Sequence, residues 1–328
     1  MIRFIAIASL CLFLAEANSE PEPTSYLTGN PQDAQPSSKL IGGYALMGGG
    51  GDVDEAFRWL LKRAFGGDVV VIRASGSDGY NPYFFSELGV KVDSVQSLVF
   101  KNQKQAFAQS TRDALSNAEL IFIAGGDQSK YIRFWKDTPV EELLNQHVAS
   151  GKPIGGTSAG LAILGELSYS AMHQGNLTSA LALKYPNHRY ITIENDFLKL
   201  PGLETILTDT HFSERDRMGR LITMLRFCHL NQLAESPIGL GIDEATALCL
   251  DEKRNARVFS ARGGKAHFVR LENFEEDSFE GTNALITSLG PHNEFKPLFS
   301  QDSLSNLVQI RAQIKNSKIE YAVFSDDD

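Results

Sequence analysis

The stretch that decides the fold is Ile154-Gly-Gly-Thr-Ser-Ala-Gly-Leu161. It contains the pattern G-x-S-x-G between two apolar segments, which is typical of a sharp turn from a strand into a helix. Gly156 and Gly160 lack a Cβ, so this turn can close, and Ser158 is expected at its tip. The pattern predicts a serine nucleophile, with the backbone N–H of Ala159 facing a developing oxyanion. The alternative is a glycine-rich loop that holds a serine by chance.

Strands and helices alternate on both sides of this turn. Short apolar runs predict buried strands, and the segments between them have the apolar spacing of helices. The expected strands are 44–47, 68–73, 97–100, 119–124, 205–208, 238–242, 247–250, 256–259 and 266–271, and the expected helices are 53–64, 103–116, 140–149 and 213–230. This alternation predicts the α/β class, with a mainly parallel sheet covered by helices on both faces, in a single domain over residues 39–328.

The N-terminal residues carry a targeting pattern. A short basic start, an apolar run over 4–15 and small residues before position 20 predict a cleaved signal peptide over residues 1–19. The protein is therefore expected to be secreted or periplasmic, without a membrane anchor after cleavage. The alternative is an uncleaved anchor helix, although the run is short for a membrane span. Residues 20–38 are rich in Pro, Ser, Gln and acidic residues, and we expect a flexible lead-in there.

Charge and cysteine content limit the partners. With 40 acidic and 31 basic residues, the chain has a formal net charge of −9, which argues against nucleic acid or an anionic membrane as its main partner. Two cysteines, Cys228 and Cys249, follow the signal peptide. They could be two buried thiols or one disulfide, and the sequence leaves both alternatives open. Histidines at ligand spacing are absent, so we expect no metal site, and we expect no cofactor. Homodimer formation also stays open.

Two glycine-rich runs fall at the ends of expected strands. Gly48–Gly51 could hold a phosphate, but it lacks P-loop spacing and Asp52 follows it directly, so nucleotide binding is the weaker interpretation. Gly125-Gly126 is interpreted as a turn that lets the backbone approach a substrate. The N–H of Gly126 is then a second oxyanion donor.

A histidine and two carboxylates follow later strands. His211 lies just after the run 205–208, where a general base for Ser158 would be needed. Asp243 and Glu244 end the run 238–242, and either could orient the imidazole. A turn capped by an aspartate is the alternative for Asp243.

Three arginines follow His211 within one helical segment. Arg217 and Arg220 lie three residues apart and share a helix face, and Arg215 lies on the neighbouring edge. In an acidic chain, arginines beside a candidate catalytic histidine indicate an anionic or carboxylate-bearing substrate. The alternative is a solvated helix face on which Glu214 and Asp216 pair with these arginines.

Four segments together resemble a known family. They are Gly125-Gly-Asp-Gln128, Gly156-Thr-Ser-Ala-Gly160, Asp209-Thr-His-Phe212 with its Arg-x-Arg-x-x-Arg tail, and Gly241-Ile-Asp-Glu244. In this order they resemble the cyanophycinase-like serine peptidases of peptidase family S51, which also includes α-aspartyl dipeptidase, or peptidase E. The resemblance covers about residues 42–250. It implies a flavodoxin-like fold of the class I glutamine amidotransferase type.

The resemblance also implies roles for individual residues. Ser158 would be the nucleophile, His211 its base and Glu244 the acid that orients the base. Residues matching the family motifs would line the substrate groove: Gln128, Asp209, Arg215, Arg217 and Arg220. Cyanophycinases cut the aspartyl backbone of multi-arginyl-poly-aspartate and release β-Asp-Arg dipeptides. The expected partner is therefore a peptide substrate that is acidic or aspartyl.

Two departures and two alternatives accompany this interpretation. Thr210 and Glu214 stand where cyanophycinases carry glutamine, so a secreted peptidase of related chemistry is expected, and its substrate stays open. An esterase of the α/β-hydrolase type would instead use Asp196 with His267 or His292. A catalytically silent binding protein of the same fold is the other alternative.

Overall fold

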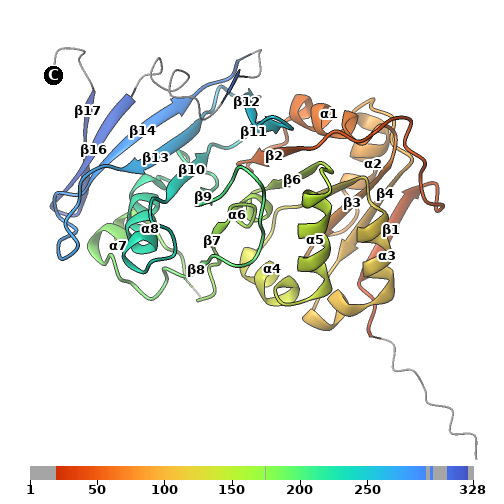
Figure 1. Cartoon of the computed structure of the whole chain (residues 1–328), viewed down its shortest axis with the longest axis horizontal. Coiled ribbons are helices and arrows are strands. Elements are labelled where there is room, and N and C mark those ends of the chain that lie inside the picture. The colour runs from red at the N-terminus through yellow and green to blue at the C-terminus, as the bar shows by residue number, and fades with distance from the viewer. Residues whose placement is uncertain (1–19, 174, 293–295, 298–308, 324–328) are drawn as a thin grey trace, which may run out of the picture.

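The computed structural model describes residues 20–173, 175–292, 296–297 and 309–323 of the 328-residue chain. Within this part the α/β class is confirmed, and the strands form two sheets that lie side by side (Figure 1). The expected signal peptide, residues 1–19, lies outside the described residues.

The larger sheet has a parallel centre flanked by antiparallel strands. Its strands among the described residues, in spatial order, are β1 (Thr24–Gly29), β4 (Ser94–Val99), β3 (Asp68–Arg73), β5 (Leu120–Ile123), β6 (Ile154–Thr157), β2 (Gly43–Met47), β11 (Thr246–Asp251), β12 (Asn255–Ser260) and β15 (Lys296–Pro297). The order β4-β3-β5-β6 is the 2-1-3-4 order of flavodoxin. The fifth place is taken by β2, which precedes these strands in the chain.

Helices cover both faces of the larger sheet, as expected. They are α1 (Asp54–Lys62), α2 (Tyr80–Pro82), η1 (Tyr83–Glu87), η2 (Gln103–Phe107), α3 (Gln109–Asn117), α4 (Gln128–Trp135) and α5 (Pro139–Ala149). Alternate side chains of β3 point to opposite faces. Val70 and Ile72 pack with the buried side chains of α3, α4 and α5, while Val69 and Val71 pack with those of α1 and η1. The near-continuous apolar run of β3 therefore reflects burial on both faces.

The smaller sheet was not anticipated as a separate layer. Its strands, in spatial order, are β17 (Lys318–Val323), β16 (Gln309–Lys315), β14 (Asn283–Leu289), β13 (Ala266–Leu271), β10 (Ile238–Ile242), β9 (Ile206–Asp209), β7 (Leu167–Tyr169) and β8 (Ile193–Glu194). Among these described strands β7, β9 and β10 pair in parallel, and the other ladders are antiparallel. Helices α7 (Ser179–Lys184) and α8 (Met218–Leu230) pack together beside it. The apolar run of each strand reports burial, but it does not report which sheet the strand joins.

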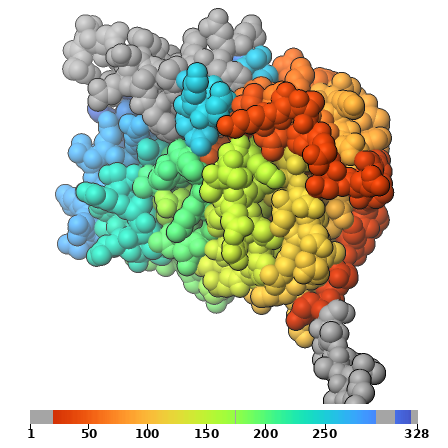
Figure 2. All heavy atoms as spheres, turned by 45° about the vertical axis from the view of Figure 1, so that its right-hand side comes forward, coloured from red at the N-terminus to blue at the C-terminus, as the bar shows by residue number. Residues whose placement is uncertain are grey.

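The turn between β10 and β11 carries the chain from the smaller sheet back to the larger one. Strand β11 pairs with β2, so Leu250 lies opposite Tyr44. On the surface, residues of the β11–β12 region (cyan) accordingly lie beside the N-terminal part of the chain (red) in Figure 2.

Residues 20–38 differ from the expected flexible lead-in. Residues 24–29 form β1, which pairs with β4 from Thr24 opposite Val99 to Gly29 opposite Ser94. Beyond β1, the N–H of Ala34 donates to a carboxylate oxygen of Asp68 (2.9 Å). An edge strand can be held by main-chain hydrogen bonds with most of its side chains exposed, so composition alone did not reveal it.

Candidate active site

Ser158 lies at a sharp turn between β6 and α6 (Ala159–Ala162). Its φ of 53° and ψ of −117° are unusual for a residue with a side chain, and such strain clusters at functional sites. A Cβ at Gly160 would overlap the carbonyl oxygen of Ile123, so the turn requires glycine there, as the sequence predicted. The Ser158 N–H donates to the carbonyl of Met47 (3.0 Å), which fixes the turn at the carboxyl end of β2.

His211 connects Ser158 to Glu244. Ser158 Oγ lies 2.8 Å from His211 Nε2, and His211 Nδ1 lies 2.6 Å from Glu244 Oε1. With its proton on Nδ1, the imidazole donates to the carboxylate and leaves Nε2 free to accept the serine proton. His211 follows β9, Glu244 lies between β10 and β11, and Ser158 follows β6, so the three side chains meet where strands of both sheets end. Of the two carboxylates left open by the sequence, Glu244 is the one in contact with His211.

The surroundings of His211 favour its neutral form. The residue is 7% exposed. Burial lowers the pKa of His211 below its usual 6.5, and the positive charges of Arg215 and Arg217 lower it further. The hydrogen bond to Glu244 raises this pKa but does not reverse the shift. A neutral imidazole beside a serine hydroxyl is able to act as a general base.

The glycine run 48–51 packs against these three side chains, a role that sequence reasoning missed. A Cβ at Gly49 would lie 2.7 Å from His211 Nε2 and 2.8 Å from Ser158 Cβ, and a Cβ at Gly50 would overlap the Glu244 carboxylate. Both glycines also have positive φ, 86° and 69°. The run therefore allows the backbone after β2 to approach the histidine and the glutamate closely. In the sequence, Asp52 argued only against phosphate binding by this glycine run.

Of the two expected oxyanion donors, Ala159 directly follows Ser158, and Gly126 belongs to a loop that contacts Ser158 through Gly125. Ala159 is the first residue of α6, so its N–H has no acceptor within that helix. Gly125 and Gly126 follow β5, and a Cβ at Gly125 would lie 3.5 Å from Ser158 Cβ. The buried Tyr131 hydroxyl is within hydrogen-bonding distance of the carbonyl oxygens of Ala124 (2.8 Å) and Gly125 (2.9 Å), which fixes this loop from below.

Asp209 and Arg220 correct the expected substrate groove. Both side chains are buried, with 3% and 4% of their surface exposed. Arg220 Nε donates to Asp209 Oδ2 (2.8 Å) and its Nη2 donates to Oδ1, which makes a bidentate pair. Arg220 also donates to the carbonyl of Leu177 (3.2 Å). These two residues therefore do not face a groove: they form a buried ion pair between β9 and α8. The sequence correctly indicated that Asp209 lies at the end of a strand and that Arg220 lies on the following helix. It did not indicate that the two side chains pair with each other.

Arg217 has an intermediate position. Its Nη1 donates to the carbonyl and the hydroxyl of Thr210 (2.7 and 3.0 Å) and to Asp209 (3.2 Å), and 12% of the side chain is exposed. Burial lowers the pKa of Arg217 to about 10, although the Asp209 charge opposes this shift. Thr210, which replaces the glutamine of the cyanophycinase motif, thus contacts this arginine directly.

The remaining predicted residues are more accessible. Arg215 is exposed and lies close enough to His211 to lower its pKa. Gln128 is half-buried at the first position of α4, directly after the oxyanion loop. Glu214, the second departure from the motif, accepts the backbone N–H of Glu244 (3.0 Å). It therefore supports the turn that carries Glu244.

The residues of the alternative esterase triad lie elsewhere. Asp196 pairs with Lys136, and His267 Nε2 lies 3.2 Å from both carboxylate oxygens of Asp243. Asp243 also accepts the N–H of Ser213 (3.0 Å), so it caps the turn that follows His211. The backbone N–H of His292 donates to Val258 (3.3 Å), a residue of β12. None of these contacts brings a second histidine to Ser158.

Comparison with known proteins decides the family. The model of peptidase family S51 matches residues 80–257, which is more than half of the chain. The chain belongs to peptidase family S51. The matched region contains Ser158, His211 and Glu244.

Curated proteins that the chain resembles include cyanophycinases. The cyanophycinase of Trichormus variabilis is 31% identical over 163 residues, which are 49% of this chain and 48% of the relative. The cyanophycinase of Synechococcus elongatus is 31% identical over 175 residues, 53% of this chain and 48% of the relative. The chain thus spans about half the length of the curated relatives it matches. Among solved structures, a peptidase from an acI-B1 Actinobacterium has a TM-score of 0.44 at 15% identity, covering 88% of this chain and 96% of that one.

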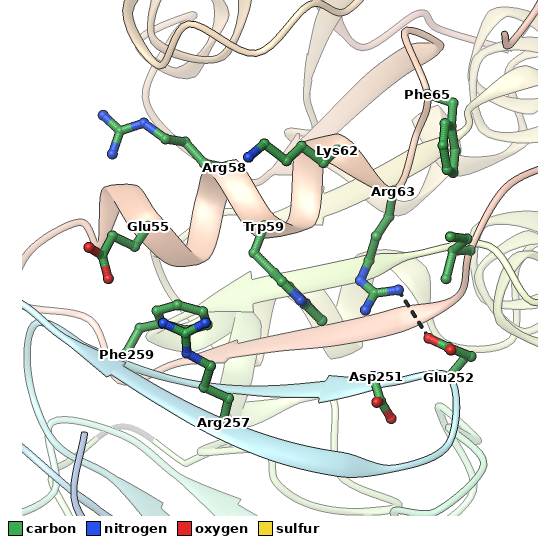
Figure 3. Close-up of a pocket in the computed structure, with 11 residues that line it drawn as sticks. Glu55, Arg58, Trp59, Lys62, Arg63, Phe65, Asp251, Glu252, Arg257 and Phe259 are labelled. Carbon is green, nitrogen blue, oxygen red and sulfur yellow. Dashed lines mark hydrogen bonds and ion pairs between the residues drawn. The ribbon is translucent and has the colours of Figure 1, made fainter. Parts of the chain in front are cut away.

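Other features of the S51 peptidase lie away from these residues. A pocket of about 670 Å³ opens between α1 and β12, where Arg63 points toward Glu252 and donates to its carboxylate (3.3 Å; Figure 3). The pocket lining includes no residue of the Ser158 site. Cys228 and Cys249 are buried free thiols. Over the described residues no cluster of three metal-ligating side chains occurs. The described helices also include none long and apolar enough to cross a membrane.

Proposed function

We propose that this S51 peptidase hydrolyses peptide bonds through an acyl-enzyme formed on Ser158. His211 takes the hydroxyl proton while Ser158 Oγ attacks the substrate carbonyl. The N–H groups of Gly126 and Ala159 stabilise the oxyanion. His211 then gives its proton to the leaving amine, and a water molecule, activated by the same imidazole, releases the acyl group. Glu244 holds the imidazole in the tautomer that this sequence of steps needs.

One observation carries this proposal: the unbroken contact from Ser158 Oγ to His211 Nε2 (2.8 Å) and from His211 Nδ1 to Glu244 Oε1 (2.6 Å). A serine with a positive φ at a strand-to-helix turn supports it, because the turn presents the hydroxyl away from the sheet. Structural serine–histidine contacts do not need a third group that fixes the tautomer.

The proposed substrates are acidic, with aspartyl peptides and cyanophycin first. Arg215 is exposed beside His211, and Arg217 has its Nη1 committed to protein acceptors while no hydrogen bond from its Nε or Nη2 occurs among the described residues. Guanidinium groups bind carboxylates through two parallel hydrogen bonds, so these arginines suit a carboxylate close to the cleaved bond. The cyanophycinase relatives point the same way.

Two measurements test the proposal together. A serine-directed phosphonate should label the wild-type protein at Ser158, and peptide mapping by mass spectrometry would locate the label. Cyanophycin and Asp-X peptides, each beside its neutral counterpart, should then be incubated with the protein and their products identified by mass. Labelling without hydrolysis of any peptide would overturn the acidic-peptide proposal, and absence of labelling would overturn the acyl-enzyme.

We also propose that the protein is exported from the cytoplasm. The apolar run over 4–15 supports export, and a chain cleaved after residue 19 would begin directly before the segment that leads into β1. Mass determination of the protein recovered from a secreting host would show the mature N-terminus. A cytoplasmic protein that keeps residues 1–19 would contradict export.

A further inference from the structure

Arg73 is a cation near the proposed nucleophile that does not belong to the arginine motif at 215–220. Two of the arginines at 215–220 are tied to Asp209, whereas Arg73 ends β3 on the other side of Ser158. Strand β3 pairs with β5, with Ile72 opposite Ile123. After β3 the chain forms β4 on one side of it and then crosses over to form β5 on the other side, so β3 and β5 lie at a topological switch point. Ligands of such sheets bind at the carboxyl ends of the strands at this point.

The loop after β3 folds around the Arg73 guanidinium. Arg73 Nε donates to the carbonyl of Ser75, and Nη1 donates to the carbonyl of Ser77 (3.2 Å). The guanidinium also lies 6.0 Å from the ring centroid of Tyr80. Nε and Nη1 are thus held by main-chain acceptors, and Nη2 is left with no hydrogen-bond partner among the described residues. The guanidinium is therefore fixed in position before any ligand arrives.

This loop adjoins the oxyanion donor. A Cβ at Gly126 would lie 3.5 Å from Ser75 Oγ, and a Cβ at Gly125 would lie 3.5 Å from Ser158 Cβ. The two glycines thus form a short bridge from the proposed nucleophile to the loop that holds Arg73. If the Gly126 N–H binds the substrate carbonyl oxygen, as proposed above, the residue next to the cleaved bond would lie beside this loop.

The charge of Arg73 has no protein counterion in the described ranges. It takes part in no ion pair there, whereas Arg220 and Arg217 share Asp209. Arg73 is half-buried in a chain with nine more acidic than basic residues. Gly76 packs beside this guanidinium, since a Cβ there would lie 2.5 Å from Nη2. A fixed guanidinium whose Nη2 has no protein acceptor favours carboxylates over neutral groups.

We propose that Arg73 and its loop form a carboxylate-binding subsite for the residue next to the cleaved bond. This proposal rests on the peptidase function above and names a group that selects its acidic substrate. The ligand is the side-chain or terminal carboxylate of the peptide.

The test compares pairs of peptides that differ only in Asp or Asn at each position flanking the cleaved bond. The ratio of kcat/KM for the Asp and the Asn peptide is measured in wild type, Arg73→Met and Arg73→Lys. We expect Arg73→Met to reduce this ratio by roughly tenfold or more at one position, the scale of a charged hydrogen bond. Arg73→Lys should restore part of it, since it keeps the charge but not the planar fork. The matched control is Arg133→Met, an exposed arginine that donates to the carbonyl of Met172 (2.9 Å), and it should leave the ratio as in wild type.

A second measurement covers a variant with damaged structure or low turnover. Calorimetry measures the binding of the intact Asp peptide to the Ser158→Ala variant and to the double variant Ser158→Ala, Arg73→Met. We expect the double variant to bind this peptide more weakly. An unchanged Asp/Asn ratio in Arg73→Met together with equal binding would overturn the subsite, and would place acid selection with Arg215 or Arg217. A wild type that labels at Ser158 but cleaves Asp and Asn peptides equally would overturn the subsite too, but leave the acyl-enzyme standing. Absence of labelling would instead refute the function itself.

Discussion

The two sheets contribute to the proposed active site by different physical means. The larger sheet supplies Ser158 and the oxyanion loop through backbone geometry: a strained turn, glycines in close contact and free N–H groups. The smaller sheet supplies His211 from a turn fixed by buried charges, with Asp209 paired to Arg220 below it and Asp243 in contact with His267 beside it. Glu244 lies at the turn between the two sheets. Substitutions at the turn and loop of the larger sheet should therefore affect catalysis. Substitutions of the buried charges in the smaller sheet should affect stability as well.

The largest expected effect is loss of the nucleophile. Ser158→Ala should reduce kcat by about 10⁴-fold or more, because no other group can form the acyl-enzyme. The thermal midpoint should change little, since the small side chain fits the same turn. Steady-state kinetics and thermal denaturation of the purified variant measure these two quantities. Turnover near that of wild type would refute the serine mechanism.

The buried charges of the smaller sheet should control stability. Arg220→Met leaves Asp209 buried without its bidentate partner, and breaking such a pair costs about 3–5 kcal/mol. For a chain of this size, we expect Tm to fall by on the order of 10 °C. Arg58→Met is the matched control, because it breaks an exposed pair with Asp54 that is worth about 0–1 kcal/mol. Equal Tm values for the two variants would contradict this view of Asp209 and Arg220.

The close contact at Gly49 distinguishes backbone strain from displacement of the catalytic histidine. Gly49→Ala places a methyl group 2.7 Å from His211 Nε2, so we expect kcat to fall by roughly 100-fold, the scale of a displacement of about 1 Å. Gly66→Ala is the control, because Gly66 has a similar φ of 80° but no atom within 4 Å of the added methyl. Similar kcat losses in both variants would show that strain, not contact with His211, is responsible.

The smallest effect concerns the pH profile. His211 must be neutral to act as a base, so activity should fall as pH drops through its pKa, and burial places this pKa below 6.5. Arg215→Gln removes a positive charge that lowers the pKa, so the acid limb of kcat/KM should move to higher pH. Added salt should move the wild-type limb in the same direction, because Arg215 is exposed. A limb that moves to lower pH in Arg215→Gln would contradict the assigned cause.

Local sequence patterns were sufficient for residues whose role depends on their own strand end. The G-x-S-x-G pattern predicted the turn at Ser158, because only glycine fits where a Cβ at position 160 would overlap Ile123. The alternation of strands and helices predicted the α/β class and the position of His211 after β9, because burial on both faces leaves a continuous apolar run. The family resemblance supplied Glu244, and the fold then brought it to His211.

The tertiary structure decided whatever depends on pairing between distant segments. Arg220 reads as a groove residue in the sequence, but folding places Asp209 eleven residues away within reach of its guanidinium, so the two charges neutralise each other. Gly49 and Gly50 read as a loop or a phosphate cradle until β2 is placed beside β6 and β11. The second sheet and β1 were missed for the same reason: an apolar or polar run records burial or exposure, while the choice of partner strand is set by main-chain hydrogen bonds that leave no mark in composition.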